Sequence, residues 1–458
     1  MRVCDRCIHR AVRRGIARLN TGCPGHDGVV PLSAGPHRAS SILAKVDGSL
    51  IYLDHAATSW PKPPQVAEAM VHFLAESAGN PGRGAHRLAR AAVATIDAVR
   101  RRLAAVVNAE RPERVVLTHG CTDAINIAIH GLLLECRKAP SPTRPHVVIS
   151  AAEHNAIART VHAYARDGLI EMTVVPCDAE GFIAPGLLLG AVREETVLVC
   201  LSHASNAAGT IQPVAEVGRG LRRMGSQALF LVDGAQTAGH VPIDVQGFQI
   251  DLLSLAGHKG LLGPTGTGAL YVGPRAYADD PAGPRRLMCT RAGGTGAKSP
   301  GLDMPAELPD VLEAGTSNAV GFAGLLAALE HHPPPEAGAA GDSESFAHEI
   351  ACAMRMIEGL SRISGVRIHG RRSSRGRTGV VLFTVSGYDP RELGALLDSS
   401  FSIAVRAGLH CAPLMHQALG TAPAGGVRAS CGPSTTFDEV DALVEAVGEL
   451  ASAAPAGV

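Results

Sequence analysis

The sequence predicts an α/β protein with a large domain on a mainly parallel sheet and a smaller α+β domain behind it. Length is the first indication, because 458 residues at roughly 100–200 residues per domain correspond to two or three domains. The second is the hydrophobic fraction of 46%, which is enough for a large core. The third is a regular alternation of β-rich and helical runs from Ser49 to about Leu312, which is typical of a parallel sheet covered on both faces.

The elements of the large domain follow in chain order. Six short runs of mostly apolar residues predict strands, as expected where both faces of a sheet are buried. They are Arg114–Thr118, His146–Ser150, Met172–Pro176, Thr196–Ser202, Ala228–Asp233 and Gly268–Val272. Longer runs between them have helical patterns, for example Val66–Ala78, Ala89–Val107 and Thr122–Leu134.

The second half ends in a smaller unit. The segment His331–Gly341 (HHPPPEAGAAG) predicts a loop or linker. A helix follows, then two or three strands (around Val366–His369 and Gly379–Val385) and a final helix near Phe437–Ala451. We therefore expect a large domain over residues 65–312 and a small α+β domain over residues 313–458. Residues 50–64 are expected to pack near the active site.

Residues 1–49 differ from the rest and are predicted to form an appendage and linker. They are rich in Arg, Gly, Pro and Ser, and they hold Cys4, Cys7, Cys23 and His26. These four side chains have the types and spacing of tetrahedral zinc ligands. The alternative is a disordered or misassigned start to the chain, because the body of the protein needs nothing before about Ser49.

Charge and composition exclude several classes of function. Lys plus Arg and Asp plus Glu both number 42, so no overall field draws the chain to nucleic acid or an anionic membrane. No apolar run reaches the ~18 residues of a membrane span, and the charged N-terminus does not look like a secretory signal. The eleven scattered cysteines fit reduced thiols, and we expect a cytoplasmic protein.

The strongest chemical signal is an aspartate and a lysine. Asp233 ends the strand in ALFLVDGAQTAGH, and Lys259 lies in the Gly-rich run LSLAGHKGLLG. The chain has only five lysines, so each retained primary amine carries weight. An amine for an aldehyde and a carboxylate for a pyridinium nitrogen are what pyridoxal 5′-phosphate (PLP) requires. The alternative is an ordinary strand-end Asp and a surface Lys.

Other polar residues follow neighbouring strands, at the edge where open α/β sheets bind ligands. Gly120, Cys121 and Thr122 form a turn into a helix whose N-terminus could hold a phosphate. His154 and Asn206 each come shortly after a strand, where an imidazole could stack on a flat ring. Taken singly, Thr122 could be only a helix cap, and His154 and Asn206 only structural residues.

A second reactive group lies far along the chain. Cys411 stands next to His410 and five residues after Arg406, in the loop AVRAGLHCAPL. Cationic neighbours favour a thiolate nucleophile, although a buried and inert Cys is the commoner case. Arg428, in GGVRASCG, is a candidate fork for a substrate carboxylate, or otherwise a surface arginine.

Together these motifs identify a family resemblance. The chain resembles the cysteine desulfurase and selenocysteine lyase family, which are class V aminotransferase-like PLP enzymes of fold-type I. The matching segments, in order from about Ile51 to about Val447, are IYLDHAATSWPKP, GNPGRGAHRLA, EHNA, SHASNAAGTIQP, DGAQTAGHVPID, GHKGLLGPTGTGALY, EAGTSN and VRAGLHCAPL. The resemblance implies a seven-stranded, mainly parallel sheet and a homodimer.

The resemblance also implies the cofactor contacts. Lys259 would form the Schiff base, Asp233 would contact the ring nitrogen and His154 would stack on the ring. The other implied contacts are Gln236 and Asn206 beside the ring hydroxyl, Gly120, Cys121, Thr122 and His258 at the phosphate, and Thr295 at the phosphate of the partner subunit.

The implied reaction converts L-cysteine to L-alanine and leaves the sulfur on Cys411 as a persulfide. Lys259 would act as general base, Arg428 and Arg406 would face the substrate carboxylate, and Asn206 and Ala56 would lie beside the substrate. The sulfur would pass to an acceptor protein or small thiol, for example toward iron–sulfur cluster assembly.

Alternatives on the same fold remain open. A selenocysteine lyase, or a C–S lyase acting on a larger thioether, would use the same cofactor, and an inactive sulfur-assembly scaffold would not turn over. The chain departs from its relatives at Ala256, where a hydroxyl residue is frequent, and at His55, where Asn is frequent. Cys121 also replaces a hydroxyl residue, so we expect it to offer mainly its backbone N–H.

Overall fold

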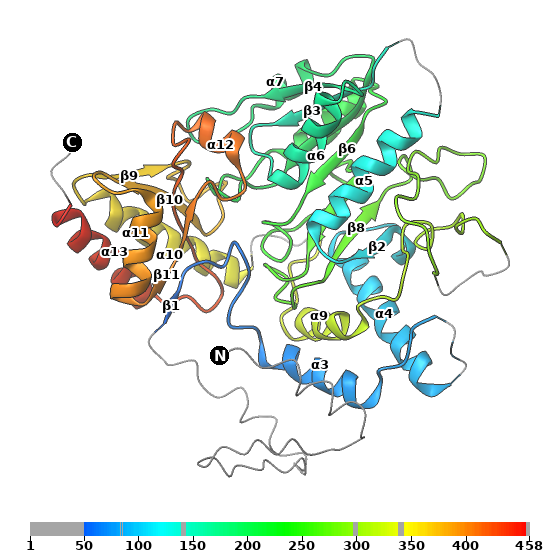
Figure 1. Cartoon of the computed structure of the whole chain (residues 1–458), viewed down its shortest axis with the longest axis horizontal. Coiled ribbons are helices and arrows are strands. Elements are labelled where there is room, and N and C mark those ends of the chain that lie inside the picture. Colours follow the sequence, from blue (N-terminus) through cyan, green and yellow to red (C-terminus); the bar gives the residue numbers. More distant parts are fainter. Residues whose placement is uncertain are drawn as a thin grey trace, which may run out of the picture. The chain divides into compact units, whose positions relative to one another are not determined.

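The computed structural model describes residues 50–82, 84, 86–138, 143–295, 301–337 and 343–454 (Figure 1). The chain separates into two units, Met1–Ser49 and Leu50–Val458. The candidate zinc ligands Cys4, Cys7, Cys23 and His26 lie outside the described residues, so both the zinc site and its alternative stay open. None of the described helices is long and apolar enough to cross a bilayer.

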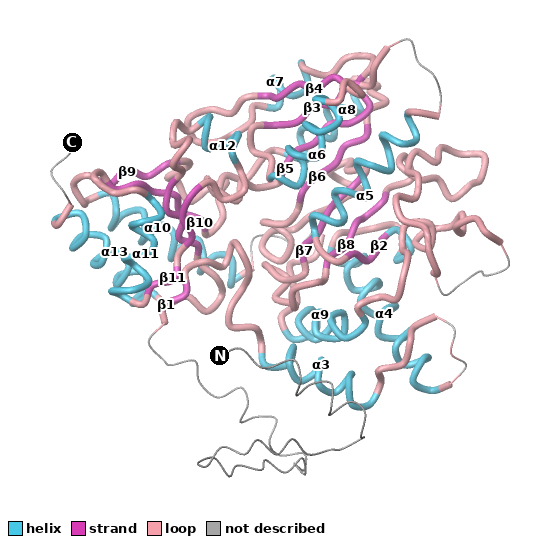
Figure 2. Tube along the Cα trace, in the orientation of Figure 1, coloured by secondary structure: helices cyan, strands magenta, loops and turns pink. Residues whose placement is uncertain are grey.

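A seven-stranded sheet organises the larger part of the second unit, as the resemblance implies (Figure 2). In spatial order its strands are β2 (Val115–Thr118), β8 (Gly268–Val272), β7 (Leu252–Ala256), β6 (Leu229–Asp233), β5 (Thr196–Ser202), β3 (His146–Ser150) and β4 (Glu171–Val175). Only β8 runs against its neighbours β2 and β7; the pairs from β7 to β4 are parallel. The carboxyl ends of the other six strands therefore meet at one edge.

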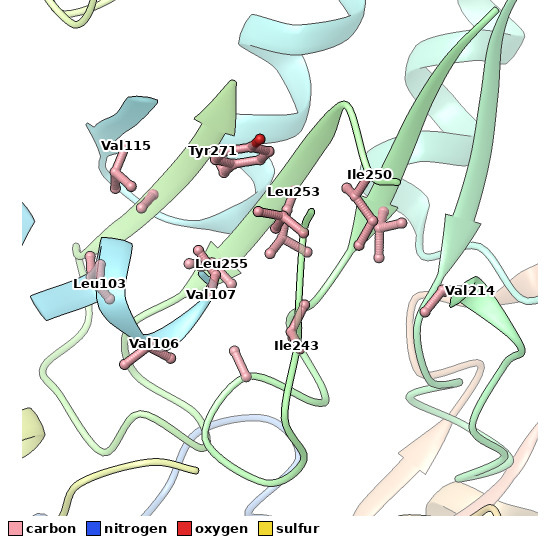
Figure 3. Close-up of a cluster of buried hydrophobic side chains, with 14 of the residues drawn as sticks. Leu103, Val106, Val107, Val115, Val214, Ile243, Ile250, Leu253, Leu255 and Tyr271 are labelled. Atoms are coloured by element: carbon pink, nitrogen blue, oxygen red, sulfur yellow. The ribbon is translucent and has the colours of Figure 1, made fainter. Parts of the chain in front are cut away.

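The sheet is buried on both faces because its strands are apolar at successive positions. In β6, Phe230 and Val232 enter one core cluster, while Leu229 and Leu231 enter the other. This alternation follows from the two-residue period of a strand. Figure 3 shows part of the first cluster, where Leu253, Leu255 and Tyr271 of the sheet meet side chains of the covering helix and loops.

Helices cover both faces. The helices of this region are α3 (Pro64–Glu76), α4 (Arg87–Val106), η1 (Pro112–Arg114), α5 (Cys121–Cys136), α6 (Asn155–Arg166), α7 (Pro185–Gly190), α8 (Val214–Arg223) and α9 (Ala319–His331). Side chains of α4, α8 and α9 belong to the first core cluster, and those of α5 and α6 to the second. The sheet is thus enclosed between two helical layers.

A smaller four-stranded sheet forms the C-terminal part. Its order is β12 (Arg406–Gly408), β13 (Gly426–Ser430), β10 (Val380–Val385) and β9 (Val366–His369), and every pair is antiparallel. Helices α10 (Glu344–Ser361), α11 (Pro390–Phe401) and α13 (Phe437–Ser452) share its core (Figure 1). The short helix α12 (Pro413–Ala418) follows β12, and β1 (Ile51–Tyr52) pairs in parallel with β11 (Ile403–Ala404).

The structure differs from the sequence prediction in three places. Strand β7 was not among the six predicted runs; its sequence, LLSLA, has no β-branched or aromatic residue to indicate a strand. The small sheet has four strands rather than two or three. Helix α9 lies beyond the predicted boundary at residue 312, but Phe322, Leu325 and Leu329 pack in the core of the large sheet beside α3 and α4.

Candidate active site

Most of the predicted site residues meet in one cavity of about 650 Å³ at the carboxyl edge of the large sheet. Strand register explains the convergence, because Ser202, Asp233 and Ser254 are aligned neighbours on β5, β6 and β7. The predicted residues that line the cavity are Ala56, Gly120, Cys121, Thr122, His154, Asn206, Asp233, Gln236, His258, Lys259 and Arg406. The cavity lining does not include the described residues Thr295, Cys411 and Arg428.

Asp233 and Lys259 form the charged centre of the cavity. Burial lowers the pKa of the Lys259 ammonium, against the opposing influence of the Asp233 carboxylate. A lowered pKa increases the neutral fraction of the amine, which is the form that attacks a carbonyl or accepts a proton. The Oδ1 atom of Asp233 accepts the N–H of Ala235 at 2.9 Å, which fixes the carboxylate at the end of β6.

Cys121 makes a contact that the sequence analysis did not predict. Its thiol donates to Asp233 Oδ1 at 3.2 Å and lies 3.1 Å from Ser254 Oγ. Burial, followed by the nearby Asp233 charge, raises the pKa of the Cys121 thiol well above its usual value. The protonated thiol therefore acts as a hydrogen-bond donor to the carboxylate, in addition to any role of its backbone N–H.

The start of α5 and His258 give the cavity a part that suits an anion. Gly120 has φ +154°, and a Cβ there would meet no atom within 4 Å, so the turn before α5 is open. The first N–H groups of a helix have no partner within the helix, and those of Cys121 and Thr122 lie here. Burial lowers the pKa of His258 to about 4, so the ring is neutral. Its Nδ1 is buried without a partner among the described residues.

The side walls come from three loops. His154 caps α6, because its Nδ1 accepts the N–H of Ala156 at 3.0 Å. Burial also lowers the pKa of His154, so a neutral ring lines the cavity. Gln236 donates to the carbonyl of Ala56 at 3.0 Å and holds the N-terminal segment against the site. Within the described residues, Asn206 keeps a buried Oδ1 without a partner.

Cys411 lies on the loop between β12 and α12 and is half-buried. The guanidinium of Arg406, which lines the cavity, places Nη2 3.4 Å from the Cys411 sulfur. The loop is tied to the large sheet at two points: Asn155 N–H donates to the Cys411 carbonyl at 2.7 Å, and the Asn206 side chain donates to the His410 carbonyl. The cationic Arg406 therefore lies beside the thiol, and Asn155 and Asn206 hold the loop that carries it.

Arg428 is a buried arginine that contacts Asn206. Its side chain is fully buried on β13, where Nη1 donates to the Asn206 carbonyl at 3.0 Å and Nη2 pairs with Asp54. Its Nε has no partner among the described residues. The surface alternative is thus wrong, and the predicted contact of Arg428 with a substrate carboxylate stays a prediction.

Glu153 is a buried residue to which the sequence analysis gave no role. Its carboxyl accepts hydrogen bonds from the Ser150 hydroxyl, the Ser202 N–H and the Ser202 hydroxyl. It therefore joins the ends of β3 and β5, from which His154 and Asn206 extend. An acidic residue three positions after the end of a buried strand, in ISAAEHNA, was the available signal.

Comparisons with known proteins agree with this arrangement. Residues 51–443 match the family model for aminotransferase class-V. A probable cysteine desulfurase of Methanothermobacter thermautotrophicus is 33% identical over 402 residues, which cover 88% of this chain and 94% of that protein. A cysteine desulfurase of Escherichia coli is also 33% identical over 402 residues, covering 86% and 92%. The solved apo structure of a cysteine desulfurase from Thermococcus onnurineus superimposes with a TM-score of 0.77 at 29% identity, covering 88% and 95%.

The fold and the cavity define a PLP-dependent enzyme of the fold-type I class. More particularly, the chain belongs to the aminotransferase class-V family and, within it, to the cysteine desulfurases. The cavity fits the cofactor: it offers a lysine with a lowered pKa, a carboxylate for the ring nitrogen and an open helix N-terminus for the phosphate.

Proposed function

We propose that this protein is a cysteine desulfurase that converts L-cysteine to L-alanine and receives the sulfur on Cys411 as a persulfide. One observation carries the proposal. Lys259 and Asp233 share a cavity with Arg406, and the guanidinium of Arg406 is 3.4 Å from the Cys411 sulfur. The Arg406 side chain therefore lies both in the cavity of the cofactor residues and beside the candidate sulfur acceptor.

Lys259 and Asp233 would hold PLP and prepare it for the reaction. When bound, PLP supplies an electron sink for the substrate Cα. Asp233 would keep the ring nitrogen protonated, and His154 would cover the ring. The neutral amine of Lys259 would accept the Cα proton, and burial favours that neutral form. Gly120, Thr122 and His258 would hold the phosphate.

The substrate would be oriented by its carboxylate. Arg406 lines the cavity and offers a guanidinium to it. The Nε–H of Arg428, which has no partner among the described residues, would offer a second contact to this carboxylate. Asn206 and Ala56 line the same wall and would restrict the position of the side-chain sulfur.

The sulfur transfer would use the Cys411 thiolate. Its sulfur attacks the substrate sulfur, so an S–S bond forms while the Cβ–S bond breaks and its electron pair goes to Cβ. Protonation of Cβ and return of a proton from Lys259 to Cα then give alanine, and Cys411 carries the persulfide. The Arg406 guanidinium at 3.4 Å would stabilise the attacking thiolate. An acceptor protein or a small thiol would then take up the sulfur.

We extend the proposal to a homodimer in the cytoplasm. The family resemblance would place Thr295 at the phosphate of the partner subunit. All eight cysteines of the described residues are free thiols, which fits a reducing compartment.

Two variants test the proposal. Lys259→Ala is expected to lose both the visible absorbance of bound PLP and all alanine formation from L-cysteine. Cys411→Ser is expected to keep that absorbance but to form alanine at least about 100-fold more slowly, because the positioned nucleophile is gone. Alanine formation by Lys259→Ala would refute the cofactor assignment. Normal turnover by Cys411→Ser would exclude the persulfide and favour a lyase that needs no acceptor thiol.

A further inference from the structure

The Cys411 loop has an unusual backbone. His410 and Cys411 are consecutive non-glycine residues in the left-handed region, with φ +50° and +57°. L-residues adopt this conformation only when neighbouring interactions hold them there. The hydrogen bonds from the Asn155 N–H and the Asn206 side chain fix the Cys411 and His410 carbonyl groups of this turn. They do not fix the His410 ring, which has a separate set of partners.

The His410 ring begins a chain of side-chain hydrogen bonds that leads away from the active site. Its Nε2 lies 3.1 Å from the Arg406 carbonyl, and its Nδ1 lies 3.0 Å from His416 Nε2. His416, on α12, places its Nδ1 2.7 Å from the Thr421 hydroxyl. All three side chains are buried, and the two imidazoles are stacked. The chain therefore runs from the nucleophile loop into the core beneath α12.

The direction of every bond in this chain is determined by the Arg406 carbonyl. A carbonyl only accepts, so His410 Nε2 must carry the hydrogen. Burial lowers the pKa of His410 to about 3 and that of His416 to about 4, so both rings are neutral. His410 Nδ1 is then an acceptor, and His416 Nε2 must donate to it. By the same logic, His416 Nδ1 accepts the hydrogen of the Thr421 hydroxyl.

The far end of the chain is consistent with this direction. The Thr421 hydroxyl has two acceptors within reach, His416 Nδ1 at 2.7 Å and the His416 carbonyl at 3.3 Å. The shorter contact is the one that the tautomers require. Without that hydroxyl, His416 could place its hydrogen on Nδ1 instead. Its Nε2 would then face His410 Nδ1 as a second acceptor, and the His410 ring would lose its orientation.

We propose that Thr421, through His416 and His410, is a positioning residue for Cys411. The order of the three hydrogens holds the His410 ring against the Arg406 carbonyl. Arg406 in turn places its guanidinium beside the Cys411 sulfur. An effect of Thr421 on desulfurase turnover would rest on the proposed function. Its effect on the reactivity of the Cys411 thiol does not.

The matched pair Thr421→Val and Thr421→Ser tests the proposal. Valine keeps the shape of threonine but removes the donor, whereas serine keeps the donor. The full-length protein with bound PLP is treated with iodoacetamide at neutral pH without substrate, and alkylation of the Cys411 peptide is followed by mass spectrometry. Loss of one buried hydrogen bond predicts a roughly five-fold change in rate for Thr421→Val, and Thr421→Ser should stay within about two-fold of the wild type.

Equal alkylation rates in Thr421→Val and the wild type would overturn the proposal. So would an equal change in both variants, because a purely structural role would not separate valine from serine. An unchanged visible spectrum of bound PLP serves as the control for folding. If Thr421→Val does not fold, Thr421→Ala replaces it with the same expectations. If the wild-type protein has no desulfurase activity, the proposed function is refuted, but the alkylation result still tests this proposal.

Discussion

Replacing Glu153 by glutamine is expected to make the protein less sensitive to rising pH. The carboxyl is fully buried between the ends of β3 and β5, where Ser150 and Ser202 donate to it. Burial raises its pKa from 4.5 to about 7, although these hydrogen bonds act in the opposite direction. A glutamine side chain has the same shape, accepts from the Ser202 N–H and can donate to the Ser202 hydroxyl.

The size of the effect follows from the pKa difference. Because the folded pKa is above the unfolded one, the wild-type carboxyl is protonated in both states below pH 4.5 and imposes no penalty there. Between pH 4.5 and about 7 the carboxyl ionises in the unfolded state but stays protonated in the folded state, so the unfolding free energy falls by about 3 kcal/mol. Glu153→Gln has no such group, so its stability relative to the wild type should increase by about 3 kcal/mol between pH 4.5 and pH 8.

Denaturant unfolding followed by circular dichroism at several pH values measures this difference. Other titrating groups are common to both proteins and cancel in the comparison. Glu445→Gln, at an exposed position of α13, is the matched control and should show no such trend. A stability difference between Glu153→Gln and the wild type that stays constant with pH would refute the reasoning.

Two further predictions concern buried groups near the site. Asp54→Ala should lower the unfolding free energy by about 3 kcal/mol, because it leaves the buried Arg428 guanidinium without its charged partner; a loss below about 1 kcal/mol in denaturant unfolding would contradict this. Cys121 should resist iodoacetamide at pH 8 in the folded protein while Cys411 reacts, because burial raises the pKa of Cys121. Equal alkylation of the two peptides by mass spectrometry would show that Cys121 is not held as a protonated donor.

Much of the site could be predicted from the sequence because parallel strands end at a common edge. Asp233, His154 and Asn206 each follow a predicted strand, so their convergence required only the fold class. Lys259 lies beyond a strand that the sequence did not indicate, yet it lines the same cavity.

Contacts between distant segments could not be predicted in the same way. Arg428 and Asp54 are 374 residues apart, and nothing in either local pattern indicates the pair. The hydrogen bond from the Cys121 thiol to Asp233 likewise depends on how α5 lies against β6. The His410–His416–Thr421 chain is local in sequence, but its bond directions became evident only once the Arg406 carbonyl was placed.

The most direct test of the central claim is the mass of the Cys411 peptide after the purified protein with bound PLP reacts with L-cysteine. The account predicts that this peptide gains one sulfur atom, that a reducing agent removes it, and that alanine appears in an equal amount. Alanine formation with an unmodified Cys411 peptide would contradict the account, because the sulfur would then have left by another route.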